Sequence, residues 1–286
     1  MFKYRLISFP ILLGIAFAVV FWQPYGSWIF AAAAVPLIMA AALECCNMAE
    51  SAKFHVNAFA AAAIAVFVMV KCGLAVPELA AFRSRLPGVP VLTVILMMWL
   101  LLQLLFTGKR EKAVQSLFTT PGAIVLALLP ALPLAMVFYE YGPFYFISLA
   151  LCTKAADTGG YIFGMLSGKL MKNGNHKIVP SISPKKSWEG TVGAALFSIG
   201  TAFLLNKFDC LTLDLNCWQL VIFGFLAFLG SFAGDLTESC LKRAAGIKDS
   251  GSWIPGMGGI MDVLDSFLYN APLFYLALKS GVLVCQ

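Results

Sequence analysis

The chain has 286 residues, of which 60% are hydrophobic and only 12% charged, and its formal net charge is +6. Soluble globular domains carry about 25% charged residues, so this composition excludes an ordinary soluble protein and indicates an integral membrane protein. The positive charge implies no nucleic-acid partner, because basic cytoplasmic loops are what membrane insertion requires and they also face anionic lipid.

Apolar segments recur along the chain, each near the length that an α-helix needs to cross about 30 Å of hydrocarbon. We count about nine, at residues 6–22, 28–43, 54–76, 91–106, 121–139, 143–156, 191–205, 218–233 and 266–284. None shows the period-2 alternation of a barrel strand, and backbone groups in lipid must be paired within a helix or a closed sheet. The predicted fold class is therefore all-α: a polytopic integral membrane protein with about nine transmembrane helices and a polar site that faces the cytoplasm.

Basic residues are unevenly distributed between the two sides of these helices. With the N-terminus inside, most Lys and Arg residues fall in cytoplasmic segments, and only Arg83, Arg85 and Lys207 fall outside. This follows the positive-inside rule. The first apolar segment has a basic start but no small-residue cleavage site, which favours an uncleaved helix over a signal peptide. We predict a multi-pass protein of the cell membrane whose N-terminus and active site are cytoplasmic.

Polar residues become organised only in the second half of the chain. We predict an N-terminal transmembrane scaffold at residues 1–106, a basic cytoplasmic linker at 107–120 and a catalytic transmembrane domain at 121–286. The eight cysteines contain no C-x-x-C pair and indicate no zinc site. A disulfide between Cys210 and Cys217, which share a predicted outside loop, stays open. His55 and His176 lack partners and are interpreted as loop residues.

Two predicted cytoplasmic loops carry opposite charges. Residues 153–190 hold six lysines against Asp157 and Glu189, a net charge of +4, and residues 234–265 hold three basic against five acidic residues, a net charge of −2. A site that handles polyphosphate with a divalent metal needs both signs, because carboxylates hold hard cations while lysines neutralise phosphate oxygens. The sequence contains neither a P-loop nor a G-x-G-x-x-G motif to hold a nucleotide.

The acidic residues of the second loop also have a simpler interpretation. Asp235 is placed to cap a helix, and Asp262 and Asp265 would complement the dipole at the start of the last helix. If Asp235 opens a helix, Ser239 and Lys242 continue one polar stripe along it. The glycines that follow permit positive φ and close approach of the backbone to a ligand. Taken singly, capping and ligand binding are both open.

Four stretches of the second half form a recognisable signature. They are residues 154–161 (KAADTGGY), 183–190 (SPKKSWEG), 239–243 (SCLKR) with Lys248 and Asp249, and 255–265 (PGMGGIMDVLD). Together they resemble the phosphatidate cytidylyltransferase (CDP-diacylglycerol synthase) family, sharply from about residue 121 and only generally before it. The resemblance implies transfer of cytidylyl from CTP to phosphatidate with Mg²⁺, giving CDP-diacylglycerol and pyrophosphate. It also implies membrane lipid as a partner, and helices of the first half that could form a homodimer.

Two positions depart from the family pattern. Met257 stands where the family usually has His, and Val263 stands where it usually has Arg. Met257 can neither bind phosphate nor carry a proton, so we assign no catalytic acid or base there, and Val263 removes a bidentate phosphate contact. Both changes bear on substrate preference rather than on the metal site, whose Asp residues are present.

The predicted site stabilises charge more than it moves protons, because the nucleophile is an anionic phosphate oxygen. The predicted metal ligands for Mg²⁺ are Asp235, Asp262 and Asp265, with Asp249 as a further ligand or an orienting group. Phosphate contacts are assigned to Lys242, Arg243 and Lys248, and the polyphosphate or lipid headgroup to Ser183, Lys185 and Lys186. Ser239, Gly258 and Gly259 are assigned to substrate binding, and Asp157 and Glu189 position the basic groups or hold a second cation.

Two other functions stay open. A CTP-dependent lipid kinase acting on a polyprenol or phytol would also need carboxylates and lysines at the membrane surface. A metal or proton transporter would place its carboxylates within the spans. After Glu140, the acidic residues other than Asp209 and Asp214 lie in predicted cytoplasmic loops or at helix junctions, which favours surface chemistry. A purely structural scaffold is the third alternative.

Overall fold

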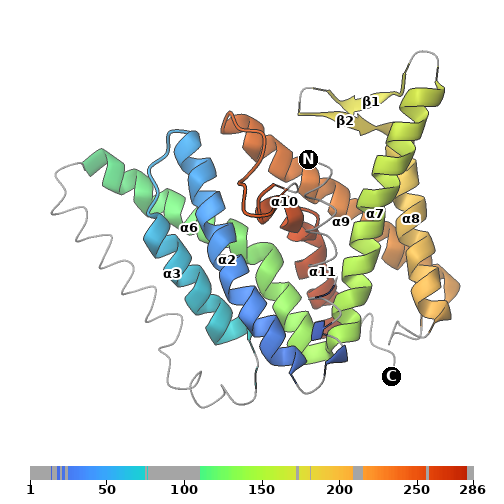
Figure 1. Cartoon of the computed structure of the whole chain (residues 1–286), viewed down its shortest axis with the longest axis horizontal. Helices are drawn as coiled ribbons and strands as arrows, with labels where there is room; N and C mark the ends of the chain where they lie inside the picture. Colours follow the sequence, from blue (N-terminus) through green and yellow to red (C-terminus); the bar gives the residue numbers. More distant parts are fainter. Residues whose placement is uncertain are drawn as a thin grey trace. The chain divides into compact units, whose positions relative to one another are not determined.

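The computed structural model describes residues 25–74, 76, 110–171, 174–180, 182–208, 215–255 and 258–281, with a few isolated residues before 25; for residues 110–118 it describes the backbone alone. This part of the chain is largely helical (Figure 1). Its elements are α2 (Gly26–Ser51), α3 (Ala58–Val68), η1 (Met69–Gly73), α6 (Arg110–Met136), η3 (Val137–Tyr141), α7 (Pro143–Leu170), β1 (Lys177–Val179), β2 (Ser183–Ser187), α8 (Trp188–Lys207), α9 (Cys217–Ala244), α10 (Met261–Leu264) and α11 (Phe267–Lys279).

Four of the described helices are long and apolar enough to cross a membrane. They are Gly26–Ser51, Thr119–Tyr141, Trp188–Lys207 and Cys217–Ala244, and a shorter apolar helix covers Ala58–Gly73. The prediction of an all-α polytopic membrane protein is confirmed. The count of nine is not, since the predicted spans 91–106 and, for the most part, 6–22 lie outside the described residues.

Two predicted loops are wrong at their starts. The loop predicted at 153–190 begins as helix, because α7 continues to Leu170, and it ends as the hairpin β1–β2. The loop predicted from 234 also begins as helix, because α9 continues to Ala244. Asp235 therefore lies inside α9 and caps no helix. The apolar run ends where a helix leaves the hydrocarbon, but the helix itself continues wherever its polar residues are solvated or paired.

The described chain forms two compact units. The first comprises residues 1–140 and 241–263, and the second comprises 141–240 and 264–286. The predicted division into residues 1–106, 107–120 and 121–286 rests on composition and stays a prediction.

In the first unit, α2, α3 and α6 pack against one another (Figure 1). Asn57 begins α3 by accepting a hydrogen bond from the Ala60 N–H at 2.9 Å, and its own N–H donates to Thr120 Oγ1 at 3.0 Å. Near the other end of α2, the Phe30 and Phe138 rings stack with centroids 4.2 Å apart. Polar caps and ring contacts thus fix the relative register of these apolar helices.

In the second unit, α7 and α8 pack closely along their length (Figure 1). Glycines at the contact allow this approach: a Cβ on Gly159 would lie 2.5 Å from the Gly193 carbonyl oxygen, and one on Gly193 would lie 2.4 Å from Phe163. Strands β1 and β2 pair in antiparallel fashion, and β2 contacts both helices. Ser187 ends β2 and caps α8 by accepting from the Gly190 N–H at 3.2 Å.

Candidate active site

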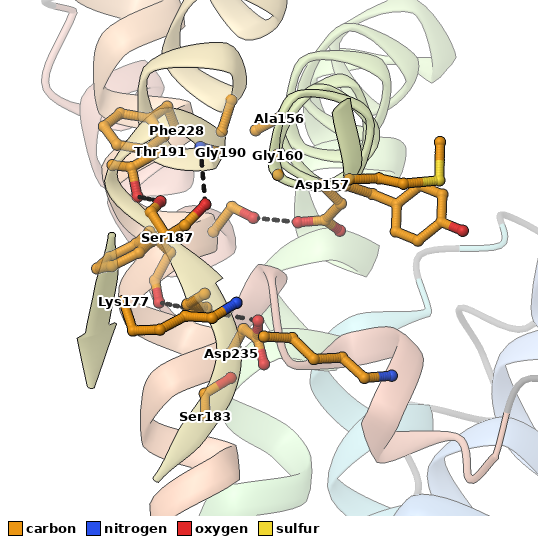
Figure 2. Close-up of a pocket in the computed structure, with 18 residues that line it drawn as sticks. Ala156, Asp157, Gly160, Lys177, Ser183, Ser187, Gly190, Thr191, Phe228 and Asp235 are labelled. Atoms are coloured by element: carbon orange, nitrogen blue, oxygen red, sulfur yellow. Dashed lines mark hydrogen bonds and ion pairs between the residues drawn. The ribbon is translucent and has the colours of Figure 1, made fainter. Parts of the chain in front are cut away.

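A cavity of about 570 Å³ lies in the second unit, lined by α7, the hairpin, α8 and α9 (Figure 2). Its polar lining includes Asp157, Lys177, Ser183, Lys185, Lys186, Ser231 and Asp235. Its apolar lining includes Ala156, Ala194, Phe228 and Phe232, three of which belong to one buried cluster with Phe232 packed against it. Charged groups of both signs therefore share one cavity with an apolar wall. This suits a ligand that is anionic at one part and apolar at another.

Lys186 connects the hairpin to α9. Its side chain is only 14% exposed, and its ammonium lies 3.1 Å from Asp235 Oδ2 and donates to the Phe232 carbonyl oxygen at 3.0 Å. The same ammonium lies 4.1 Å from the centroid of the Phe232 ring. Two positions along α9, one helical turn apart, thus hold the hairpin lysine in the cavity. Two of the predicted site residues, Lys186 and Asp235, are brought together here.

Asp157 on α7 is the centre of a second polar group. One of its oxygens accepts a short hydrogen bond from Ser231 Oγ on α9. The other accepts from Ser266 Oγ at 2.9 Å and from the Lys154 ammonium at 3.1 Å. Lys154 also donates to Ser266 Oγ at 2.7 Å. Asp157 is therefore paired with Lys154 on its own helix, and its predicted role, to position the hairpin lysines or to hold a second cation, stays a prediction.

Asp265 belongs to the same acidic region. Its Oδ1 lies 2.9 Å from Ser266 Oγ, so the single hydrogen of that hydroxyl is donated either to Asp265 or to Asp157 at one time. Desolvation by the surrounding protein raises the pKa of Asp265 to about 6, and the negative charges of Asp235 and Asp157 act in the same direction, against Lys154. The carboxylates of Asp157, Asp235 and Asp265 are thus electrostatically linked within the second unit, where they concentrate negative charge. We call these three residues the acidic centre.

Asp262 lies in the first unit, in a compact turn. Its Oδ1 lies 2.6 Å from the Lys242 ammonium, and both side chains are only 11% exposed. Its Oδ2 accepts from the Gly259 N–H at 2.7 Å and from the Ser250 hydroxyl at 3.0 Å. Burial alone would raise the pKa of Asp262, but these hydrogen bonds and the Lys242 charge outweigh burial and lower the pKa. Asp262 is therefore an ionised, fully paired carboxylate.

Gly258 has to be glycine for this turn to form. Its φ is +100°, and an added Cβ would meet Asp262 Oδ2 at 2.5 Å. The other two predicted substrate-binding residues nearby differ in setting: Gly259 is buried, and Ser239 on α9 donates to Asp235 Oδ1 at 3.3 Å. The assignment of all three to substrate binding stays a prediction.

The remaining predicted residues lie on the surface, on the hairpin or, for Glu189, in the first turn of α8. Arg243, Lys248 and Asp249 are exposed, and the Arg243 guanidinium donates to the Ile247 carbonyl oxygen at 3.1 Å. Glu189 accepts from His176 Nδ1 at 2.7 Å, so His176, which we interpreted as lacking a partner, has one. Met257 lies outside the described residues, as does Cys210 of the pair that left a disulfide open.

No ligand set for a metal is already assembled among the described residues: no three His, Cys, Asp or Glu side chains group closely enough. Of the predicted metal ligands, Asp235 and Asp265 belong to the second unit and Asp262 to the first. The Mg²⁺ site therefore stays a prediction.

Sequence reasoning missed several residues that the structure ties to these groups. They are Glu44, Lys154, Lys177, Ser231, Ser250 and Ser266. Glu44 carried a readable signal, because an acidic residue beside an apolar run is costly to bury unless it has partners. The serines carried none, since Ser is common in membrane helices and loops.

Comparison with known proteins gives a consistent result. The model of the cytidylyltransferase family matches residues 3–280, so the chain belongs to that family, and the resemblance predicted from the signature is confirmed. A chloroplastic phosphatidate cytidylyltransferase 4 of Arabidopsis thaliana is 43% identical over 128 residues, which cover 45% of this chain and 30% of the relative. A phosphatidate cytidylyltransferase of Staphylococcus epidermidis is 40% identical over 146 residues, covering 50% and 53%. One of Mycobacterium bovis is 38% identical over 143 residues, covering 50% and 44%. The chain matches about half, or less, of the length of these relatives.

Proposed function

We propose that this protein is a phosphatidate cytidylyltransferase that works at the cytoplasmic face of a cell membrane. The observation that carries the proposal is the cavity of the second unit, in which hairpin lysines and carboxylates share one space with an apolar wall. The names of the relatives support the substrate assignment. CTP supplies the polyphosphate, and phosphatidate supplies both a phosphate and an apolar part.

In the proposed reaction, a phosphate oxygen of phosphatidate attacks the α-phosphorus of CTP. A new P–O bond forms, the bond from the α-phosphorus to the β-phosphate oxygen breaks, and pyrophosphate leaves with the electron pair. Lys177, Lys185 and Lys186 hold the polyphosphate and neutralise the charge that develops on the leaving group. No general base is required, because the attacking oxygen is already anionic.

The donor types of the acidic centre fit Mg²⁺, because hard cations prefer carboxylate and hydroxyl oxygens. Burial is the main cause of the raised pKa of Asp265, and the negative charges of Asp235 and Asp157 raise it further; a bound cation would relieve that repulsion. Asp235 and Asp265, with Asp157, would hold the ion in the second unit, and Asp262 remains a ligand predicted from the signature. When bound, Mg²⁺ supplies charge neutralisation at the phosphates.

The test is product formation from radiolabelled CTP, phosphatidate and Mg²⁺ by the purified protein in detergent. We expect a chloroform-soluble, labelled liponucleotide and release of pyrophosphate. A CTP-dependent lipid kinase would instead phosphorylate an added polyprenol or phytol and form no liponucleotide. That result, or the absence of any lipid-linked label with phosphatidate, would reject the proposal.

A further inference from the structure

Glu44 is a fully buried carboxylate inside the apolar helix α2. Its exposed fraction is 0%, and α2 is one of the helices long enough to cross a membrane. Burying an ionisable side chain costs several kcal/mol unless it is hydrogen-bonded or paired. A carboxylate buried at such a position is expected to have a structural or functional role, and its hydrogen-bond partners indicate that role.

The partners of Glu44 all come from the turn that precedes and begins α10. Oε1 accepts from the Ile260 N–H at 2.9 Å, and Oε2 accepts from the Met261 N–H at 2.8 Å. Ser250 Oγ donates to Oε2 at 3.1 Å. More than 200 residues separate Glu44 from each of them along the chain. Glu44 thus anchors a distant turn through both of its oxygens.

Two glycines let the turn approach Glu44. A Cβ on Gly251 would meet Glu44 Oε1 at 2.3 Å, and a Cβ on Gly259 would meet Glu44 Oε2 at 2.4 Å. These distances are shorter than any contact that a real Cβ makes, so larger residues would displace either the turn or the carboxylate. Gly251 and Gly259 therefore leave the space that the Glu44 carboxylate occupies.

The same turn holds Asp262. Gly259 donates its N–H to Asp262 Oδ2, and the next two N–H groups along the chain donate to Glu44. Ser250 Oγ lies 3.1 Å from Glu44 Oε2 and 3.0 Å from Asp262 Oδ2. A hydroxyl has a single hydrogen, so Ser250 donates to one carboxylate at a time and keeps the two at a fixed separation. The orientation of Asp262 toward Lys242 thus depends on a turn that Glu44 fixes.

We infer that Glu44 is a positioning residue for Asp262 and Lys242 in the reaction. The inference rests on the proposed function for its kinetic part and on the hydrogen bonds above for its structural part. The competing view is that Glu44 only stabilises the first unit. The two views differ in whether turnover falls while the protein stays folded, because groups that orient reacting residues typically change activity 10- to 100-fold when they are replaced.

The test is Glu44→Gln, which keeps the side-chain length but replaces one acceptor oxygen by a donor. We expect kcat to fall about 10- to 100-fold, with the KM for CTP changed less than about 3-fold. Hydrogen exchange at the amides of residues 259–262 should become faster, with no change in α8. The control is Glu50→Gln, which alters an exposed residue of the same helix and should leave both measurements unchanged.

Ser250→Ala is the second variant, and it decides the question if Glu44→Gln does not fold. It removes the hydroxyl that lies between Glu44 and Asp262 but leaves the Ile260 and Met261 hydrogen bonds to Glu44 in place. Because the link between the two carboxylates is lost, we expect about a 10-fold loss of kcat. A folded Glu44→Gln or Ser250→Ala protein with wild-type kcat would overturn the inference. Failure of the proposed function looks different: the wild-type protein itself would form no liponucleotide, while the exchange measurement would still report on the Glu44 anchor.

Discussion

Lys186 and Asp235 form an ion pair in the second unit between a lysine that we propose binds polyphosphate and a carboxylate that we propose holds Mg²⁺. The lysine reaches α9 from a two-stranded hairpin, and it is held by a carboxylate, a carbonyl and an aromatic ring. An incoming polyphosphate offers the ammonium stronger acceptors than a carbonyl, so the lysine has partners both with and without substrate. Its charge is thereby kept inside the cavity rather than in bulk water.

Lys186→Met should weaken the enzyme at the step that binds or holds polyphosphate. Hydrogen bonds to charged groups contribute about 1.5–3 kcal/mol, so kcat/KM for CTP should fall about 10- to 100-fold, mainly through KM. Steady-state kinetics in detergent micelles measure this. Lys207→Met, at the end of α8, is the matched control for loss of one positive charge. An unchanged kcat/KM in Lys186→Met would remove this lysine from the substrate site.

We expect the pH dependence of activity to follow the protonation of the Asp265 carboxyl. Its pKa of about 6 means that the carboxyl is protonated below pH 6, so cation binding and turnover should decline there. The effect on stability has the opposite sign. Because the folded state binds this proton more tightly than the unfolded state, the stabilisation is complete below the usual Asp pKa of about 3.9 and is lost as the pH rises through 6.

The variant Lys154→Met distinguishes the titration of Asp265 from the ionisation of the substrates. Lys154 lowers the pKa of Asp265, so its removal should move the acid limb of the activity profile to higher pH. CTP and phosphatidate titrate identically in both proteins and cancel in the comparison. Lys169→Met, also on α7 but exposed, should leave the limb in place. A limb that moves to lower pH, or not at all, would contradict the assignment.

At the scale of elements, the turn between α9 and α10 places the backbone of Gly258 directly against Asp262. Gly258→Ala forces an L-residue into φ +100° and drives a Cβ against Asp262. We expect at least a 10-fold loss of activity, because Asp262 must move. Gly246→Ala is the control: Gly246 also has a positive φ, +71°, but an added Cβ meets nothing within 4 Å. It should cost about 1 kcal/mol of stability and little activity. Equal activity losses in the two variants would show that strain alone, and not contact with Asp262, is responsible.

The elements also show how far sequence reasoning reaches. Apolar length predicts α2, α8 and α9, because the thickness of hydrocarbon sets it. It fails at helix ends, as Leu170 and Ala244 show, since a helix can continue beyond the membrane without apolar residues. The hairpin was missed because its strands are short and lysine-rich, with no alternating apolar face.

The same reasoning applies to the candidate site. The charge pattern pointed to Asp235, Asp262 and Lys186, because charged residues are rare in this chain and therefore informative. It could not pair them, since Lys186 to Asp235 and Lys242 to Asp262 are contacts between elements. The partners of Glu44 could not be predicted for the same reason, because they lie more than 200 residues away along the chain.

At the scale of the whole molecule, the family membership and the apolar helices define a membrane protein, and the homodimer implied by the resemblance stays a prediction. Its orientation can be tested on one helix. Cys217 and Cys240 are both exposed and lie on α9, 23 residues apart, which corresponds to about 35 Å of helix. That distance exceeds the hydrocarbon thickness of about 30 Å, so the two thiols should lie on opposite sides of the membrane.

The basic loops predict which thiol lies on which side. With the N-terminus inside, the start of α9 is outside and its end, with Lys242 and Arg243, is cytoplasmic. A membrane-impermeant maleimide, applied after mild reduction, should label Cys217 in right-side-out vesicles and Cys240 in inside-out vesicles. Cys217→Ser and Cys240→Ser identify each labelled site. The reverse pattern would place the end of α9 outside, away from cytoplasmic CTP, and would reject the proposed orientation together with a cytoplasmic active site.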